Sequence, residues 1–115
     1  KKDGQFLPDL SRIKIDIDPQ HIELIKNGLR KVVESGTGVE INTGVTNLPP
    51  VSGKTGTAED WKTGLDHAWF VCFTPSEKSE LLVVAFAQNT PGGGSAHALP
   101  MAKEILKVWN KKNLN

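Results

Sequence analysis

The sequence has few of the features that mark specialised classes of protein. It contains a single cysteine, Cys72, which excludes an internal disulfide framework and a zinc site built from several cysteines. Its longest apolar run, Leu81 to Ala87, is far shorter than the roughly 20 residues that a membrane-spanning helix needs. No charged segment followed by an apolar one opens the sequence as a secretion signal would. Lysine and arginine form no run longer than two, so nucleic-acid binding is not expected.

What remains is the composition of an ordinary globular protein. The 115 residues are 37% hydrophobic and 23% charged, with a net charge of +1. This length suits one modest domain or a part of a larger one, and no internal repeat or domain boundary is apparent. His21, His67 and His97 lack metal-ligand spacing with one another and with Cys72. We therefore expect structural roles for them, and predict no metal and no cofactor.

The first third of the sequence predicts a strand and then a helix. Apolar residues alternate from Ile13 to Ile17, which is typical of a short half-buried strand. Asp18 can cap a helix whose first residue is Pro19, and isoleucine, leucine and valine continue at helical spacing to Ser35. Gly36 is expected to end the helix in the left-handed conformation.

Three strands are predicted after a long loop from Gly36 to Pro50. The first covers Val51 to Glu59, the second Ala68 to Thr74 and the third Leu81 to Gln88. The short turn before the third strand predicts an antiparallel hairpin. Because the third strand is almost continuously apolar, we expect an interior strand covered on both faces.

A second helix is predicted at the C-terminal end, after the bend Gly92-Gly93-Gly94. Its expected apolar face comprises Met101, Ile105, Leu106, Val108 and Trp109. Trp69 and Trp109 are expected to pack between the sheet and this helix, and Trp61 is expected on a loop. The predicted fold class is mixed α+β, with a three-stranded antiparallel sheet flanked by an N-terminal and a C-terminal helix.

The most informative segment is Lys54-Thr55-Gly56-Thr57, in the first predicted strand. Alternate side chains of a strand share a face, so Thr55 and Thr57 should project together. Gly56 has no Cβ to obstruct the backbone of a ligand. Such a strand edge can pair with an extended peptide, while hydroxyls and an ammonium group bind its carboxylate. A phosphate-binding loop is excluded, because it needs a glycine where Leu48 stands.

The surroundings of this segment resemble a known family. Lys54-Thr55-Gly56-Thr57-Ala58-Glu59 is followed by the run His67 to Pro75, then by the apolar strand and the glycine bend. This order resembles the end of a penicillin-binding-protein transpeptidase domain of the serine β-lactamase/transpeptidase-like fold. The elongation-type class B members are the most similar. One departure is Cys72, where the family pattern usually has glycine, and this should alter packing rather than chemistry.

The resemblance implies a role for each residue of the segment. As catalytic residues, Lys54 would hold the hydrogen-bond network of the site and the N–H of Thr57 would form half of an oxyanion hole. Thr55, Gly56 and Thr57 would bind substrate, the hydroxyls contacting the carboxylate. The implied partners are a peptidoglycan stem peptide ending in D-Ala-D-Ala, β-lactam antibiotics and the rest of the domain. The implied location is the bacterial envelope, at the outer face of the cytoplasmic membrane, anchored through a segment outside this chain.

The family mechanism also needs a Ser-x-x-Lys pair and a Ser-x-Asn motif. The match at Ser11-Arg12-Ile13-Lys14 runs into the predicted strand, where Ser11 and Lys14 would face opposite sides. No Ser-x-Asn occurs. Residues 1–115 are therefore interpreted as an incomplete, C-terminal portion of the domain, inactive alone. A β-lactamase or β-lactam sensor of the same fold and a non-catalytic peptide-binding module remain as alternatives.

Overall fold

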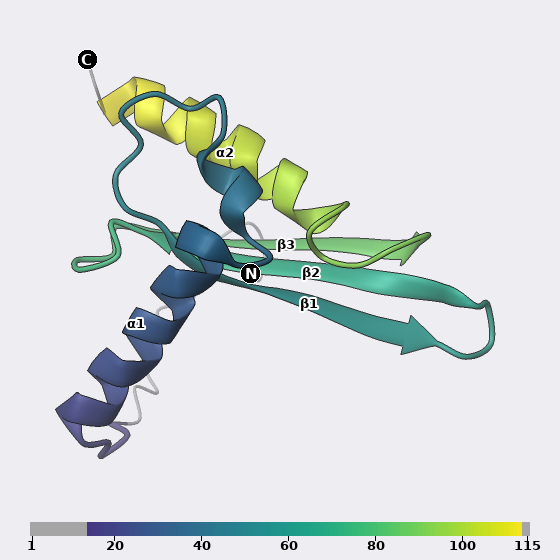
Figure 1. The fold of residues 1–115 in the computed structure, drawn as a ribbon, viewed down its shortest axis with the longest axis horizontal. Coiled ribbons are helices and arrows are strands. Elements are labelled where there is room, and N and C mark those ends of the chain that lie inside the picture. The colour runs from purple at the N-terminus through teal and green to yellow at the C-terminus, as the bar shows by residue number, and fades with distance from the viewer. Residues whose placement is uncertain (1–13, 114–115) are drawn as a thin grey trace, which may run out of the picture.

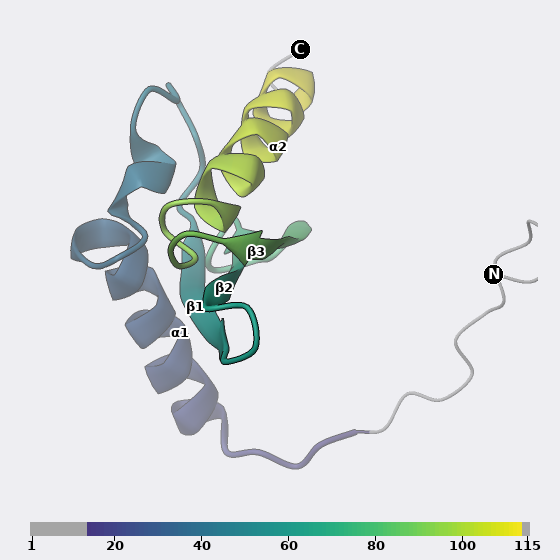
Figure 2. The same ribbon diagram turned by 90° about the vertical axis from the view of Figure 1, so that its right-hand side faces the viewer.

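The computed structural model describes residues 14–113. The elements along the chain are α1 (Pro19–Ser35), the 3-10 helix η1 (Val39–Asn42), β1 (Ser52–Asp60), β2 (Leu65–Thr74), β3 (Leu81–Thr90) and α2 (Ala98–Asn113). The strands form one antiparallel sheet in the order β1-β2-β3. Helix α2 lies across one face of the sheet, and α1 lies beside β1 and projects away from it (Figures 1 and 2). Neither helix is long and apolar enough to cross a membrane.

The first helix begins and ends where the sequence predicts. A carboxylate oxygen of Asp18 accepts a hydrogen bond of 2.8 Å from the N–H of Gln20, and Pro19 occupies the first helical position, where its missing N–H costs nothing. The predicted left-handed end is wrong, since Gly36 is extended at φ −107°. Its backbone leaves the helix so tightly that a Cβ there would lie 2.9 Å from the Val32 carbonyl oxygen.

The strand predicted at the N-terminal end is not confirmed. The part of it that the structure describes, residues 14–17, has no regular secondary structure. Ile13 and Ser11 lie outside the described residues. The predicted placement of Ser11 and Lys14 on opposite faces of a strand is therefore not supported by the described residues.

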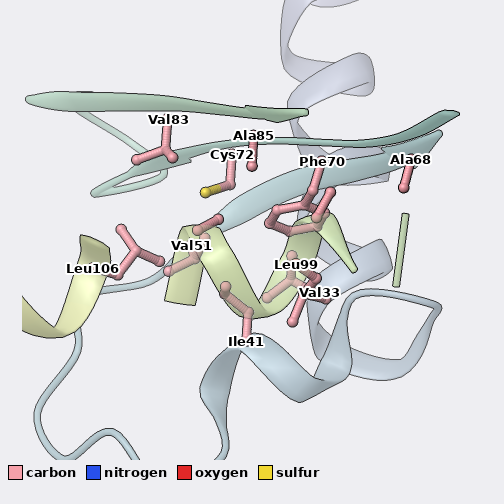
Figure 3. Close-up of a cluster of buried hydrophobic side chains, with 12 residues drawn as sticks. Val33, Ile41, Val51, Ala68, Phe70, Cys72, Val83, Ala85, Leu99 and Leu106 are labelled. Atoms are coloured by element: carbon pink, nitrogen blue, oxygen red, sulfur yellow. The ribbon is translucent and has the colours of Figure 1, made fainter. Parts of the chain in front are cut away.

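One hydrophobic core fills the space between the sheet and its cover. Ala68, Phe70 and Cys72 of β2 and Val83 and Ala85 of β3 point from the sheet toward the second helix (Figure 3). They meet apolar side chains of the helices and the connector, all buried: Val33, Ile41, Leu99, Ala102 and Leu106. Residues alternating along β2 and β3 supply this face, as a pleated sheet requires.

The opposite face of the sheet is apolar but open. Leu82, Val84 and Phe86 of β3 are 64%, 57% and 39% exposed, and within residues 14–113 no strand pairs with the outer edge of β3. The predicted interior strand covered on both faces is therefore not what these residues show. Trp69 also lies on this face, with its ring 4.3 Å from that of Phe86, so its predicted position under the last helix is wrong.

The second helix buries only part of the predicted apolar face, since Leu106 is buried but three other members of that face are not. Ala98, Leu99, Ala102 and Leu106 are buried, whereas Met101, Ile105 and Val108 are about half exposed. The small alanines let the helix approach the sheet closely, while the larger side chains remain outside. Hydrophobicity alone predicts burial of the larger side chains. Which face of α2 is buried depends on the elements that the helix contacts.

The long connector from α1 to β1 is fixed at several points. Ile41 of η1 enters the core. The Lys103 ammonium donates a hydrogen bond of 2.6 Å to the Thr43 hydroxyl, and the Asn110 amide donates one of 3.0 Å to the Thr46 carbonyl. These bonds join the connector to α2, and so fix the path by which the chain enters β1.

Candidate functional site

The Lys54-Thr55-Gly56-Thr57 segment lies in the middle of β1, at one edge of the sheet. Thr55 pairs with Phe70 and Thr57 with Ala68 across the ladder to β2. Paired residues share a face, so both hydroxyls lie on the face that α2 covers. The prediction that these two threonines project together is confirmed by the register.

Lys54 belongs to the opposite face, and its side chain is exposed. Its ammonium donates a hydrogen bond of 2.7 Å to the carbonyl oxygen of the next residue, Thr55. The cation therefore lies along the strand rather than pointing directly away from it. The ammonium and the two hydroxyls therefore belong to the same stretch of β1, although their side chains leave the backbone on opposite faces of the sheet.

The hydroxyl of Thr55 has a partner that the sequence argument missed. Its oxygen lies 2.7 Å from the hydroxyl oxygen of Thr37, and either oxygen can be the donor. Thr37 follows α1 between Gly36 and Gly38, at a point where the chain turns toward η1. The two flanking glycines were the available signal, because they mark a tight connection.

Thr57 is exposed, and it lies against the glycine bend between β3 and α2. A Cβ on Gly93 would overlap the Thr57 hydroxyl oxygen, and one on Gly94 would overlap the backbone carbonyl of Trp69. Gly92 adopts φ +140°, which only glycine accepts readily. The bend thus permits the strand-to-helix turn, as predicted, and it also packs directly on the candidate site.

Gly56 is partly buried and has a close neighbour on each face of the sheet. A Cβ there would lie 3.3 Å from the Cβ of Trp69, while the Gly94 position approaches the Gly56 backbone from the other face. Within residues 14–113, no strand pairs with the outer edge of β1. This is the edge that an added strand would approach.

The start of β1 is held by contacts with helix α1 and with the turn between β2 and β3. The Arg30 guanidinium of α1 donates a hydrogen bond of 2.7 Å to the Val51 carbonyl and forms an ion pair of 2.9 Å with Glu34. Ser52 is fully buried and donates to Ser76 over 2.9 Å. These contacts fix the strand just before Lys54.

The acidic residues at the far end of β1 do not form an acid–base pair. The side chain of Glu59 is exposed, and Asp60 shapes the turn to β2 by accepting a bond of 2.9 Å from the Lys62 N–H. That bond is the main reason why the pKa of Asp60 lies below its usual 3.8. Trp61 extends from the same turn and is 85% exposed, with the Lys62 ammonium 5.4 Å from its ring centroid.

The remaining candidate groups have structural surroundings. The ring of His67 accepts a bond of 3.2 Å from the Asn89 N–H at an irregularity in the β2–β3 register. Burial raises the pKa of Cys72 to about 12, so that thiol is inert at neutral pH. Within residues 14–113, no three histidine, cysteine, aspartate or glutamate side chains gather as metal ligands would.

Comparisons with known proteins agree on one family. The model of the penicillin binding protein transpeptidase domain matches residues 10–107. Peptidoglycan D,D-transpeptidase MrdA of Haemophilus influenzae is 29% identical over 98% of this chain and 19% of its own length. The MrdA of Acinetobacter baumannii is 33% identical over 77% of this chain and 15% of its own length. The chain thus spans under a fifth of the curated relatives it matches.

A solved structure supports the same assignment. Pseudomonas aeruginosa PBP2, in complex with WCK 5153, aligns with a TM-score of 0.70 and 29% identity, covering 93% of this chain and 24% of that one. The predicted fold class is confirmed by this likeness, and the MrdA relatives agree with the predicted elongation-type subclass. The chain belongs to the penicillin-binding-protein transpeptidase domain family.

Proposed function

We propose that this chain is the C-terminal portion of the transpeptidase domain of a peptidoglycan D,D-transpeptidase. The observation that carries the proposal is the grouping of Lys54, Thr55 and Thr57 on the edge strand of a sheet that matches this family. The chain spans 19% and 15% of the two relatives named D,D-transpeptidases and contains no Ser-x-Asn motif, so we assign the nucleophile and its base to other parts of the domain. The chain supplies the surface on which the donor peptide is held.

The peptide is bound as an added strand along the outer edge of β1. The reach of the Lys54 ammonium to the Thr55 carbonyl supports an outward direction for that carbonyl. Amides of alternate residues in a strand point to the same edge, so the N–H of Thr57 shares this direction. An outward N–H here is what an oxyanion hole requires.

Charge neutralisation is the main contribution of the segment. In the parent protein, a serine outside this chain gives its proton to its base and adds to the carbonyl of the penultimate D-alanine. The C=O electron pair becomes negative charge on the carbonyl oxygen, and when the C=O bond re-forms the terminal D-alanine leaves with a proton. The Thr57 N–H donates to that oxygen, and losing one such donor typically costs about 2.7–4 kcal/mol of transition-state stabilisation. The hydroxyls of Thr55 and Thr57, with the Lys54 ammonium, hold the terminal carboxylate, which fixes the register of the peptide.

The same surface accepts a β-lactam, whose carboxylate takes the place of the peptide carboxylate. We place the parent protein in the bacterial envelope, acting on stem peptides that end in D-Ala-D-Ala at the outer face of the cytoplasmic membrane. The anchoring segment is outside this chain. The MrdA relatives, named for peptidoglycan transpeptidation, support this location.

A labelled penicillin tests the proposal in the full-length parent protein. We expect a covalent adduct on the parent, slower labelling by at least about tenfold in Lys54→Ala because an ion contact is lost, and no adduct on the isolated chain. Lys62→Ala is the matched control, since Lys62 is an exposed lysine on the turn that follows the same strand. Labelling of residues 1–115 alone would overturn the proposal.

The same reaction separates the other hypotheses. An adduct that turns over rapidly, with release of hydrolysed penicillin, identifies a β-lactamase. A peptide ending in D-Ala-D-Ala that perturbs the NMR signals of Lys54 to Thr57, combined with a parent that forms no adduct, identifies a binding module.

A further inference from the structure

Thr37 lies outside the Lys54-Thr55-Gly56-Thr57 segment but contacts it directly. Its hydroxyl oxygen is 2.7 Å from that of Thr55, although the two residues are 18 positions apart. The contact joins the connector after α1 to the middle of β1. Within residues 14–113, neither of these two oxygens has another hydrogen-bond partner.

The position of Thr37 is fixed by the backbone on both sides. The N–H of Gly38 donates a bond of 2.9 Å to the Val32 carbonyl in the last turn of α1, and Val39 donates one of 3.2 Å to Gly36. A Cβ at Gly36 would lie 2.9 Å from the same Val32 oxygen, and one at Gly38 would lie 3.2 Å from it. Thr37 is therefore held against the end of a helix, and its hydroxyl is presented at a defined place.

The hydroxyl hydrogens of Thr37 and Thr55 limit what the Thr55 hydroxyl can bind. Each hydroxyl has one hydrogen to donate and lone pairs to accept with. A carboxylate only accepts, so Thr55 must direct its single hydrogen toward the carboxylate to bind it. The Thr55 oxygen is then free only to accept, and Thr37 at 2.7 Å must be the donor. Carboxylate binding thus selects one of the two directions that the hydroxyl pair allows.

We propose that Thr37 is a positioning residue for the carboxylate of the donor peptide, acting by donating its hydroxyl hydrogen to Thr55. The inference rests on the proposed function and adds a residue to it. Donation from Thr37 orients the Thr55 hydrogen toward the substrate and polarises that hydroxyl, which strengthens its bond to an anion. Thr37 itself does not touch the reacting atoms.

The test uses the full-length parent and measures acylation by a penicillin and by the methyl ester of the same penicillin. Thr37→Val, which keeps the shape but removes the hydroxyl, should lower the apparent affinity for the acid about twofold to tenfold, the worth of one hydrogen bond. The limiting acylation rate should change little, and acylation by the ester should be unaffected. Thr37→Ser should restore the preference for the acid.

Two further variants distinguish positioning from a general structural effect. Thr43→Val removes a hydroxyl from the same connector that bonds to Glu40 and Lys103, and it should leave the preference for the acid unchanged. Thr55→Val should abolish the effect of Thr37→Val, because the path through Thr55 is then absent. Additive losses in the double variant would overturn the inference.

The outcomes separate this inference from the function on which it rests. A parent that penicillin does not acylate overturns both. A parent that is acylated normally, with equal acid preference in the unaltered protein and in Thr37→Val, overturns the role of Thr37 alone.

Discussion

Gly93 lies directly against the hydroxyl of Thr57, so closely that a β-carbon at residue 93 would overlap the hydroxyl oxygen. The contact joins the bend before α2 to the strand that carries the candidate site. Residue 93 must therefore lack a side chain both for the turn to form and for Thr57 to keep its position in the site.

We expect Gly93→Ala to disturb the site. The added methyl group must displace either the Thr57 side chain or the bend, and overpacking of this kind costs about 1–3 kcal/mol of folding free energy. Denaturant unfolding of the parent protein measures this loss, and penicillin acylation should slow in parallel. Gly28→Ala is the control, because nothing lies within 4 Å of a Cβ at that helical position. It should stabilise α1 by roughly 0.5–1 kcal/mol. Equal stability of the two variants would contradict the prediction.

Arg30→Ala should destabilise the start of β1. The guanidinium bonds to the Val51 carbonyl over 2.7 Å, and a hydrogen bond to a charged group contributes about 1.5–3 kcal/mol. Lys26→Ala, one turn earlier on α1, removes only an exposed ion pair of 3.2 Å with Glu23 and should cost less than about 1 kcal/mol. The unfolding free energies of the two variants test this prediction. Similar losses of stability in both would show that the contact with Val51 contributes nothing.

The turn that follows β1 should weaken in acid. The pKa of Asp60 is lowered because the Lys62 N–H donates to its carboxylate. A lowered pKa in the folded state means that the contribution to stability is complete above the unfolded-state value, near 3.8, and is lost as pH falls through the folded-state value. Carboxyl NMR should show a midpoint below 3.8, with faster amide exchange at Lys62 under more acidic conditions. A midpoint above 3.8 would contradict this, and Asp60→Asn should remove the pH dependence of the exchange.

The isolated chain should self-associate through β3. Leu82, Val84 and Phe86 form an open apolar face on a strand whose outer edge is unpaired within residues 14–113. Exposed edges of this kind pair with other chains. Sedimentation should show oligomers that Val84→Lys reduces and Val39→Lys, a change at an exposed residue away from the sheet, does not. A monomer that protects the β3 amides fully from exchange would refute the prediction.

The sequence predicts the elements better than it predicts their surroundings. The start of α1 follows from Asp18 and Pro19, which act on their immediate neighbours. The sequence predicts the three strands of the sheet within three residues at each end, because alternation and turn residues are also local. The exposure of Trp69 differs from the prediction, and of the predicted face of α2 Leu106 is buried while Met101 is not, since both outcomes depend on which element packs on which side.

In the candidate site, too, the local features follow from the sequence and the contacts between distant segments do not. Its four residues are consecutive, so their grouping and the shared face of the threonines follow from strand geometry alone. The contacts of Thr37 and Gly93 with the site join segments that only the folded chain brings together. The roles of Lys54, Thr55, Gly56 and Thr57 in binding and catalysis stay predictions.

The burial of Cys72 has a practical consequence for the dynamics of the site. It is the only thiol in the sequence, it is fully buried, and its pKa of about 12 leaves it protonated at neutral pH. Alkylating dyes react with the thiolate form of cysteine, so they will not label Cys72. A cysteine introduced at the exposed position of Trp61 would then carry a single fluorophore at the tip of the β1–β2 hairpin. Its emission would report, in real time, how that tip moves when a peptide occupies the neighbouring strand edge.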